Sequence, residues 1–317
     1  MSEIKTIKIH CFSEVLSPLT HMMGVQGNEA LINRTKVASN GQIYDVPVLS
    51  GNAIRHKMIR EPGALFLLAA CGLIGKINVD QANFLFYGGS LTESAISDNL
   101  KKIAEMQELL PLIRLLGGSL KNQVIAGSLL VSMGNLICAE NREMLSRIMP
   151  FDIPLVRSSE DYVSSWQYTR GDAGKIPELL AENTELDEKS NLMIYNGQNV
   201  IPGAVFYHTF ILQRVSQLEV GALYAALEDW QKLGGGVIGG SARIGHGKMD
   251  TDIYVEGDNL DLQAYADEYR KYTYANADKI ITWLNECFPN RIAKVKATKK
   301  SKISESIDLD VCNDVAE

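Results

Sequence analysis

The sequence has 317 residues, 46% of them hydrophobic and 22% charged, which is enough apolar material for a substantial core. It contains no apolar run near the roughly 20 residues that a membrane-spanning helix needs, and no apolar stretch of signal-peptide type near its start. Five cysteines are scattered without a CxxC pair, which argues against a disulfide framework and against structural zinc. These features lead us to expect a cytoplasmic protein without a membrane partner.

The net charge of −7 is unevenly distributed. Residues 1–60 contain seven Lys or Arg and four Asp or Glu, a balance of +3, whereas the rest of the chain contains 24 and 34, a balance of −10. Towards the end, residues 291–302 are basic and residues 305–317 are acidic. Because a binding surface is made by local charge, the acidic total does not exclude a polyanionic partner.

The first part of the chain predicts strands. Residues 4–16 alternate between apolar and polar, as in a half-buried strand. Residues 17–28 are expected to form an ordered loop. Two strands, at 29–38 and 42–48, should flank a turn at Asn40-Gly41, a pair typical of hairpins.

Helices are expected next. Ser50 is a suitable N-cap for a helix that Pro62 would interrupt, after which a second apolar helix follows. A long helix should begin at Ser97, kink at Pro111 and end at Gly117.

The later elements complete an α+β pattern. Residues 151–200 are polar and partly acidic, so we expect an insertion with one hairpin or mobile loop. The other elements are predicted to be strand or mixed apolar structure at 122–138, a strand at 203–215, a helix capped by Ser216, a strand at 248–255 and a tyrosine-rich helix at 262–285. This order is compatible with a βαββαβ, ferredoxin-like core, although periodicity alone leaves it as one of several α+β options.

Residues 234–249 are exceptionally rich in glycine. Seven of the fourteen residues from Gly234 to Gly247 are glycine, which indicates positive φ angles or a close approach of backbone to another group. Arg243, His246 and Lys248 are interleaved, and exposed amides with cations suit a phosphate backbone. The segment matches GxGxxG, but it follows a helix instead of a strand, so a dinucleotide site is not predicted.

A second basic segment runs from Val46 to Arg60. A predicted strand leads into a capped helix that carries Arg55, His56, Lys57 and Arg60. The N-terminus of a helix offers free N–H groups and a positive dipole, which favour a phosphate. The alternative is a solvated basic helix face.

The histidines predict neither a metal site nor a catalytic motif. Their spacing matches no HxxxH or HExxH pattern. His21 could act as a general acid or base or stack on a nucleobase, but a histidine held by loop hydrogen bonds is the more common case. His208, in the middle of a predicted strand, favours a structural role.

Three runs of residues together resemble a known family. They are Ser-Pro-Leu-Thr-His at 17–21, the segment 46–60 with its Ser-Gly-Asn-x-Ile-Arg element, and Gly-Gly-x-x-Arg-Ile-Gly-His-Gly-Lys at 239–248. The chain resembles, over most of its length, the backbone subunit of CRISPR effector complexes. That subunit belongs to the Cas-seven family of the repeat-associated mysterious protein (RAMP) superfamily, and the similarity is to its type IV variant in particular.

The resemblance implies an α+β fold, a ferredoxin-like (RRM-like) βαββαβ palm with helical finger and thumb insertions. It implies a single RAMP-type domain over residues 1–290. Residues 291–317 have no packing pattern, so we expect them to form a mobile tail. The expected parts are a palm at roughly 1–60, 120–150 and 200–257, a helical or finger insertion at roughly 62–118, a thumb insertion at roughly 151–200 and a C-terminal helix at 262–287.

The resemblance also implies a function without catalysis. The chain would bind CRISPR guide RNA along its sugar-phosphate backbone and oligomerise into the helical backbone of an effector complex. The expected partners are guide RNA, further copies of the chain, other effector-complex subunits, and target DNA or RNA paired to the guide, with no cofactor and no metal. The implied RNA-binding residues are His21, Arg34, Lys36, Ser50, Gly51, Asn52, Arg55, His56, Arg243, Gly245, His246, Gly247 and Lys248.

Three other functions stay open at this point. An endoribonuclease of the same superfamily would use His21 or His246 on a 2′-hydroxyl. A metabolic enzyme would bind a phosphorylated small molecule at the glycine-rich segment, and an assembly protein would form filaments without nucleic acid. A cutting aspartate of the type III kind would be Asp45, Asp161 or Asp172, none of which has a recognisable cutting context.

Overall fold

The structure, a computed structural model, describes residues 5–26, 29–91, 99–154, 156–170, 193–257 and 260–289. Its centre is a sheet with the strand order β13-β1-β12-β9-β5-β4, in which β8 also pairs with β12 and every pairing is antiparallel. The strands are β1 (Lys5–Val15), β4 (Arg34–Ser39), β5 (Gln42–Leu49), β8 (Leu129–Val131), β9 (Gly134–Leu136), β12 (Val205–Val215) and β13 (Met249–Val255). With the helices below, this confirms the α+β class.

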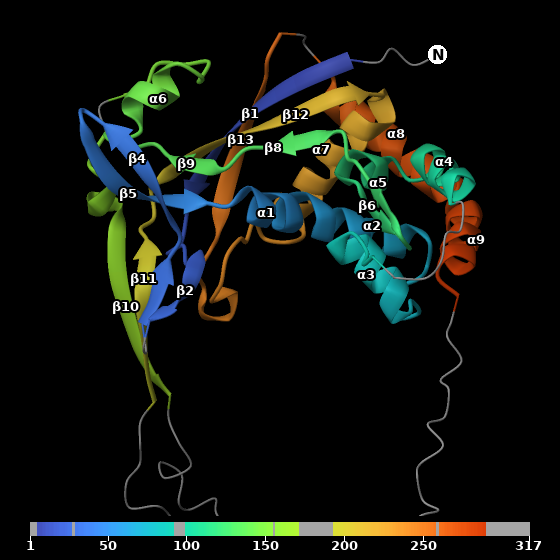
Figure 1. Ribbon diagram of the computed structural model, residues 1–317, viewed down its shortest axis with the longest axis horizontal. Coiled ribbons are helices and arrows are strands. Elements are labelled where there is room, and N and C mark those ends of the chain that lie inside the picture. Colours follow the sequence, from blue (N-terminus) through green and yellow to red (C-terminus); the bar gives the residue numbers. More distant parts are fainter. Residues whose placement is uncertain are drawn as a thin grey trace, which may run out of the picture.

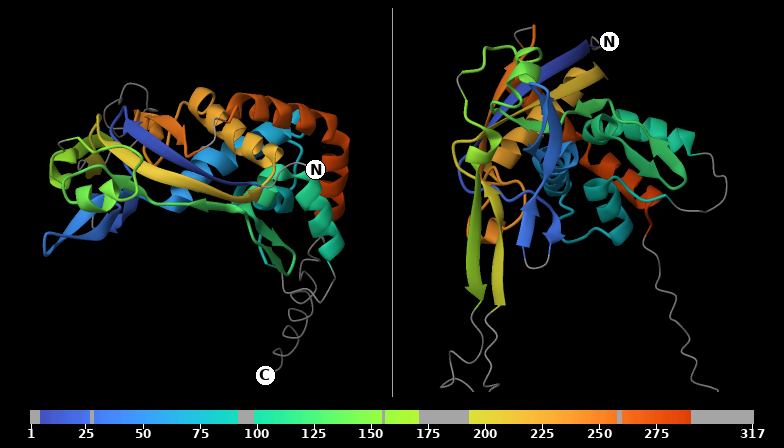
Figure 2. Two further views of the ribbon diagram at one scale, coloured as in Figure 1. Left: turned by 90° about the horizontal axis from the view of Figure 1, so that it is seen from above. Right: turned by 60° about the vertical axis from the view of Figure 1, so that its left-hand side comes forward.

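The alternation in β1 has the predicted consequence. Ile7, Ile9 and Cys11 are buried on one face of the sheet, and β1 pairs with β12 so that Ile9 lies opposite Phe210. These side chains belong to the main core together with residues of the helices that cover this face (Figure 2). On the opposite face, Tyr207 packs in a smaller apolar cluster.

A second sheet lies at one end of the molecule (Figure 1). Its order is β10-β11-β3-β2, from β10 (Val163–Arg170), β11 (Met193–Val200), β3 (Glu29–Ile32) and β2 (Met22–Gln26). Strands β10 and β11 confirm the hairpin expected within 151–200, whereas residues 171–192 lie outside the described part. The prediction of a loop over 17–28 is wrong for residues 22–26, because β2 gains a partner in β3.

The helix after Ser50 runs on through Pro62, so the predicted interruption is wrong. It comprises α1 (Gly51–Ile54), a π-helical stretch η1 (Arg55–Arg60) and α2 (Glu61–Ala70). The Glu61 N–H donates to the His56 carbonyl five residues back, so the chain is already widened where Pro62 enters the first turn of α2. In such a turn the missing N–H of proline is tolerated.

Two other helix predictions are modified. Asn99 precedes α4, and the expected cap Ser97 lies outside the described residues. The expected helix at 262–285 is divided at Asn276, whose side-chain amide donates to the Tyr272 carbonyl and ends the first part. The Ser216 capping box and the break at Pro111 are confirmed.

Most of the remaining helices lie towards the end of the main sheet that is away from the second sheet, whereas α6 (Arg142–Ser146) lies near β4 (Figure 1). The other elements are α3 (Val79–Tyr87), α4 (Leu100–Leu109), α5 (Pro111–Leu116), the hairpin β6 (Gly118–Leu120) and β7 (Gln123–Ile125), the 3-10 turns η2 (Ser159–Tyr162) and η5 (Ala242–Ile244), α7 (Gln217–Lys232), α8 (Leu262–Ala275) and α9 (Ala277–Cys287). A second apolar cluster joins α2, α3, α4, α5 and α9. In the described part of the chain, no helix is both long and apolar enough to cross a membrane.

Candidate nucleic-acid interface

The segment 17–21 brings the three sequence runs together. Thr20 forms a β-bridge with Gly240, and the Gly247 N–H donates to the Pro18 carbonyl (2.9 Å), so the segment lies along the glycine-rich loop. On its other side, the Ser50 N–H donates to His21 Nε2 (3.1 Å). The start of α1 and the glycine-rich loop are therefore attached to adjacent residues of one short segment.

The start of α1 forms one wall of an open hollow of about 470 Å³. Ser50 Oγ accepts a hydrogen bond from the Ala53 N–H (3.2 Å), which confirms Ser50 as N-cap. A Cβ on Gly51 would lie 3.1 Å from the Val131 carbonyl oxygen, so glycine lets the helix begin close to β8. The predicted residues that line the hollow are Ser50, Gly51, Asn52 and Arg55.

Arg55 gives this hollow its positive charge. Its Nε atom is buried without a hydrogen-bond partner, and no described carboxylate lies within ion-pair distance of its guanidinium. Burial lowers the pKa of Arg55, and burial together with the neighbouring Arg55 lowers the pKa of Arg60 to about 10. Both groups stay charged at neutral pH, so an anion in the hollow would relieve an unfavourable positive potential.

The glycine-rich loop confirms the expected backbone geometry. Gly239 and Gly247 have positive φ angles, and a Cβ on them would lie 2.6 Å from the Thr20 carbonyl oxygen and 2.2 Å from the Ile238 carbonyl oxygen. Gly245 has the same left-handed conformation but open space around it (φ +88°). Gly239 and Gly247 are thus needed where the loop packs closely on neighbouring backbone, whereas Gly245 is needed only for the left-handed φ of an exposed turn.

His246 is tied to the segment 17–21, and two cations flank it. Its Nδ1 lies 2.8 Å from Thr20 Oγ1, and burial lowers its pKa, so the ring is neutral at neutral pH. Arg243 and Lys248 are exposed, and no described carboxylate forms an ion pair with either of them. These two side chains extend the positive surface along the loop.

Three of the predicted RNA-binding residues, Arg34, Lys36 and His56, contact other side chains of the protein. Arg34 donates to the Asp45 carbonyl (2.9 Å) and is ion-paired with Glu160, and Lys36 Nζ lies 3.2 Å from an Asp45 carboxylate oxygen. His56 stacks on Tyr87 (centroids 5.7 Å apart), and burial is the main cause of its lowered pKa. Carboxylates thus pair with Arg34 and Lys36 in this structure, and a role of these two residues in RNA binding stays a prediction.

His21 is a hydrogen-bond acceptor in this structure. Its Nε2 accepts the Ser50 N–H, so this nitrogen carries no proton, and burial lowers the pKa of the ring. This agrees with the expectation of a loop histidine satisfied by hydrogen bonds. Among the described residues, no group of three His, Cys, Asp or Glu side chains is placed to hold a metal ion.

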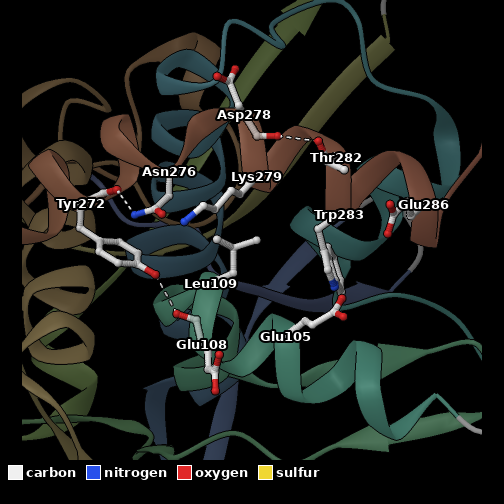
Figure 3. A pocket seen from close by; sticks show the side chains of 10 residues that line it. All are labelled: Glu105, Glu108, Leu109, Tyr272, Asn276, Asp278, Lys279, Thr282, Trp283 and Glu286. Carbon is white, nitrogen blue, oxygen red and sulfur yellow. Dashed lines mark hydrogen bonds between the residues drawn. The ribbon is translucent and has the colours of Figure 1, made fainter. Parts of the chain in front are cut away.

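Two other hollows have a different character. One, of about 480 Å³, lies between α4, α8 and α9, at the other end of the long axis from β10 and β11 (Figures 1 and 3). Its lining carries four carboxylates and one lysine, namely Glu105, Glu108, Asp278, Glu286 and Lys279. Lys102 pairs with Glu105 and Glu286. No described lysine or arginine is paired with Glu108 or Asp278, so part of the acidic net charge lies here, away from the candidate interface.

The second hollow, of about 720 Å³, lies behind the glycine-rich loop and is largely apolar. Two cations line it, but both are paired with carboxylates: Lys57 with Glu61 (2.7 Å) and Arg270 with Asp229 (2.7 Å). An anionic small molecule would have to displace one of these carboxylates. The geometry therefore disfavours a phosphorylated metabolite at this place.

Sequence reasoning missed residues that the fold adds to the surface. Thr20 lies within the recognised Ser-Pro-Leu-Thr-His run but was not singled out. Trp166 packs against His246 with its ring perpendicular (5.7 Å between centroids). The alternation Trp166-x-Tyr168 was a signal for a strand with two aromatic rings on one face, but nothing in the sequence placed that face beside His246.

Comparisons with known proteins show a similar fold in a solved structure. No protein-family model matches the chain, and no curated protein matches it. Among solved structures, the chain is similar to a chain of a "Type IV-B CRISPR Complex", with a TM-score of 0.56 and 17% identity over 80% of this chain and 92% of the other. The comparison confirms, at the level of the fold, the resemblance that the three sequence runs indicated.

Proposed function

We propose that this protein binds a CRISPR guide RNA along its sugar-phosphate backbone as a subunit of an effector complex. One observation carries the proposal: the Pro18–His21 segment holds the N-terminus of α1 and the glycine-rich loop side by side, through His21 to Ser50 and Thr20 to His246. These are the two segments whose chemistry suits phosphates. Joined, they make one surface of amides and cations that a nucleic-acid strand can follow.

The electrostatics of this surface support sequence-independent binding. Arg55, Arg243 and Lys248 have no described carboxylate as an ion-pair partner, so a phosphate can pair with each of them. Contacts to phosphate and sugar carry little sequence information, which suits a guide whose spacer sequence varies. Binding of this kind weakens steeply as salt rises, because each neutralised phosphate releases counterions.

The fold supports the assignment to a CRISPR complex. The antiparallel order β13-β1-β12-β8, with α7 between β12 and β13, is compatible with a βαββαβ, ferredoxin-like palm. The helical insertion at 62–118 would then be the finger, and β10 and β11 would belong to the thumb. The similar chain of a Type IV-B CRISPR Complex supports further effector subunits as partners. Copies of the protein would line up along one guide in the cytoplasm and present it to target DNA.

No nuclease activity is proposed. His21 Nε2 and His246 Nδ1 are each engaged in a hydrogen bond to the protein, so only the second nitrogen of each ring could move a proton at a ribose, and no described carboxylate is paired with either ring. Of the candidate aspartates, Asp45 is paired with Lys36, Asp161 is exposed on the turn η2, and Asp172 lies outside the described residues. The protein would thus bind and present RNA, with no catalytic step of its own.

The proposal is tested by co-expressing the chain with a CRISPR array. Size exclusion, the ratio of absorbance at 260 and 280 nm, and a denaturing gel of bound nucleic acid then report on binding. We expect a high-mass species that carries RNA of discrete length. A monomer that stays free of RNA even when its neighbouring subunits are present would overturn the proposal.

A further inference from the structure

Three aromatic rings form a stack on the β10/β11 hairpin. Trp166 and Tyr168 have centroids 5.4 Å apart and planes within 10°, and Tyr168 and Tyr195 have centroids 5.0 Å apart and planes within 15°. The alternation of side chains in β10 puts Trp166 and Tyr168 on one face, and Tyr195 lies directly across from Tyr168.

The backbone opposite Trp166 is shaped to hold its ring in place. Gly197 is its cross-strand partner, and a Cβ there would lie 3.0 Å from the Trp166 ring. The indole N–H donates to the Gln198 carbonyl (3.3 Å). The first ring of the stack is therefore fixed in orientation, which lowers the entropic cost of binding a flat ligand on the stack.

The stack is partly open to solvent: Tyr168 is 41% exposed, and Trp166 and Tyr195 are half-buried. The other two tryptophans of the chain, Trp230 and Trp283, are each only 3% exposed. Large rings usually lie in the core, so nearly parallel rings at the surface indicate a surface for flat ligands.

The stack also continues the candidate phosphate surface. His246 meets Trp166 edge to face, and the same histidine is bonded to Thr20 and lies between Arg243 and Lys248 in the glycine-rich loop. A strand whose phosphates contact the loop can turn its bases towards Trp166 and Tyr168. Proteins commonly bind unpaired nucleobases with aromatic rings that lie beside positively charged side chains.

We propose that Trp166, Tyr168 and Tyr195 form a stacking site for unpaired nucleobases of the strand whose phosphates bind the glycine-rich loop. This inference rests on the proposed function, because it takes that strand to be RNA. Stacking tolerates any base, since every base has a flat face, so the site would add affinity without adding sequence preference.

The test uses the full chain, freed of co-purified RNA in high salt, and two probes of about 12 nucleotides. One is oligouridylate, and the other is a ribose-phosphate strand of equal length without bases. Trp166 fluorescence should be quenched by oligouridylate and not by the strand without bases, and Trp166→Phe should abolish the quenching.

Affinity measured by fluorescence anisotropy gives the second readout. Tyr168→Ala should weaken oligouridylate binding by at least about fivefold and leave binding of the strand without bases unchanged. Tyr254→Ala is the matched control, because Tyr254 on β13 is 42% exposed but its ring packs against His10 and Phe151, away from the stack. It should bind both probes like the unaltered protein.

The outcomes separate this inference from the proposed function. Tight, salt-dependent binding of both probes without quenching, and with no effect of Tyr168→Ala, would overturn the stacking site and leave the phosphate surface intact. Failure to bind either probe would overturn both.

Discussion

Thr20 Oγ1 and His246 Nδ1 lie 2.8 Å apart and join segments separated by 226 positions in the sequence. Thr20 is fully buried, and its neighbour His21 accepts the Ser50 N–H. Two consecutive side chains thus set the distance between the glycine-rich loop and the start of α1. The spacing of the candidate phosphate contacts depends on this pair of hydrogen bonds.

Removing the Thr20 hydroxyl should therefore weaken RNA binding without unfolding the protein. Thr20→Val keeps the volume but leaves His246 Nδ1 without its partner, which costs about 1 kcal/mol, or about fivefold in affinity. Thr20→Ser should restore binding. Anisotropy titrations and melting curves of both variants test this, and a folded Thr20→Val protein with unchanged affinity would show that the bond does not position the loop.

Charge reversal at Arg55 should have a larger effect. Arg55→Glu places a carboxylate beside the predicted phosphate position, and we expect at least about tenfold weaker binding and a shallower dependence on salt. Lys279→Glu is a suitable control, because it changes the net charge equally but lies on α9 in the acidic hollow. Equal RNA retention by both variants at moderate salt would rule out Arg55 as a contact.

Two glycines in the loop should differ in their tolerance of alanine. Gly245 and Gly247 share a φ of +88°, so each Ala variant carries a backbone strain of about 1 kcal/mol. Only Gly247→Ala also forces a Cβ against the Ile238 carbonyl oxygen at 2.2 Å. Denaturant unfolding should show a loss of stability at least about 2 kcal/mol greater for Gly247→Ala, and similar losses would contradict the close approach.

His208 should make stability depend on pH. It is fully buried with its Nε2 3.1 Å from Ser13 Oγ, and burial lowers its pKa to about 3. The unfolded chain binds a proton near pH 6.5 and the folded chain does not, so this group lowers the free energy of unfolding as pH falls from about 6.5 towards 3, by up to about 1.4 kcal/mol per unit.

The variant His208→Gln isolates this contribution, because glutamine can still bond to Ser13 but does not titrate in this range. Subtracting its unfolding free energies from those of the unaltered protein, at each pH, removes the effect of the carboxylates. We expect this difference to decrease as pH falls below 6.5, by up to about 1.4 kcal/mol per unit. A constant difference would show that His208 takes up its proton in the folded state.

The sequence by itself determined the features that depend on neighbouring residues. Asn40-Gly41 forms the expected turn, Ser50 caps α1 and Ser216 forms its capping box, because each depends on hydrogen bonds or φ angles within a few positions. The alternation in β1 also predicted its buried face. The recognised runs then pointed to the two segments that the fold places together.

Only the tertiary structure decided what those segments touch. Strand β2 is a strand because β3 is available to pair with it, and β3 in turn pairs with β11, far along the chain. The same holds for charge: Arg34 meets Glu160 across 126 positions, whereas Arg55 finds no described carboxylate. Pairing between strands and between distant charges is set by the folded path of the chain, so local propensity could not decide which cations face a ligand.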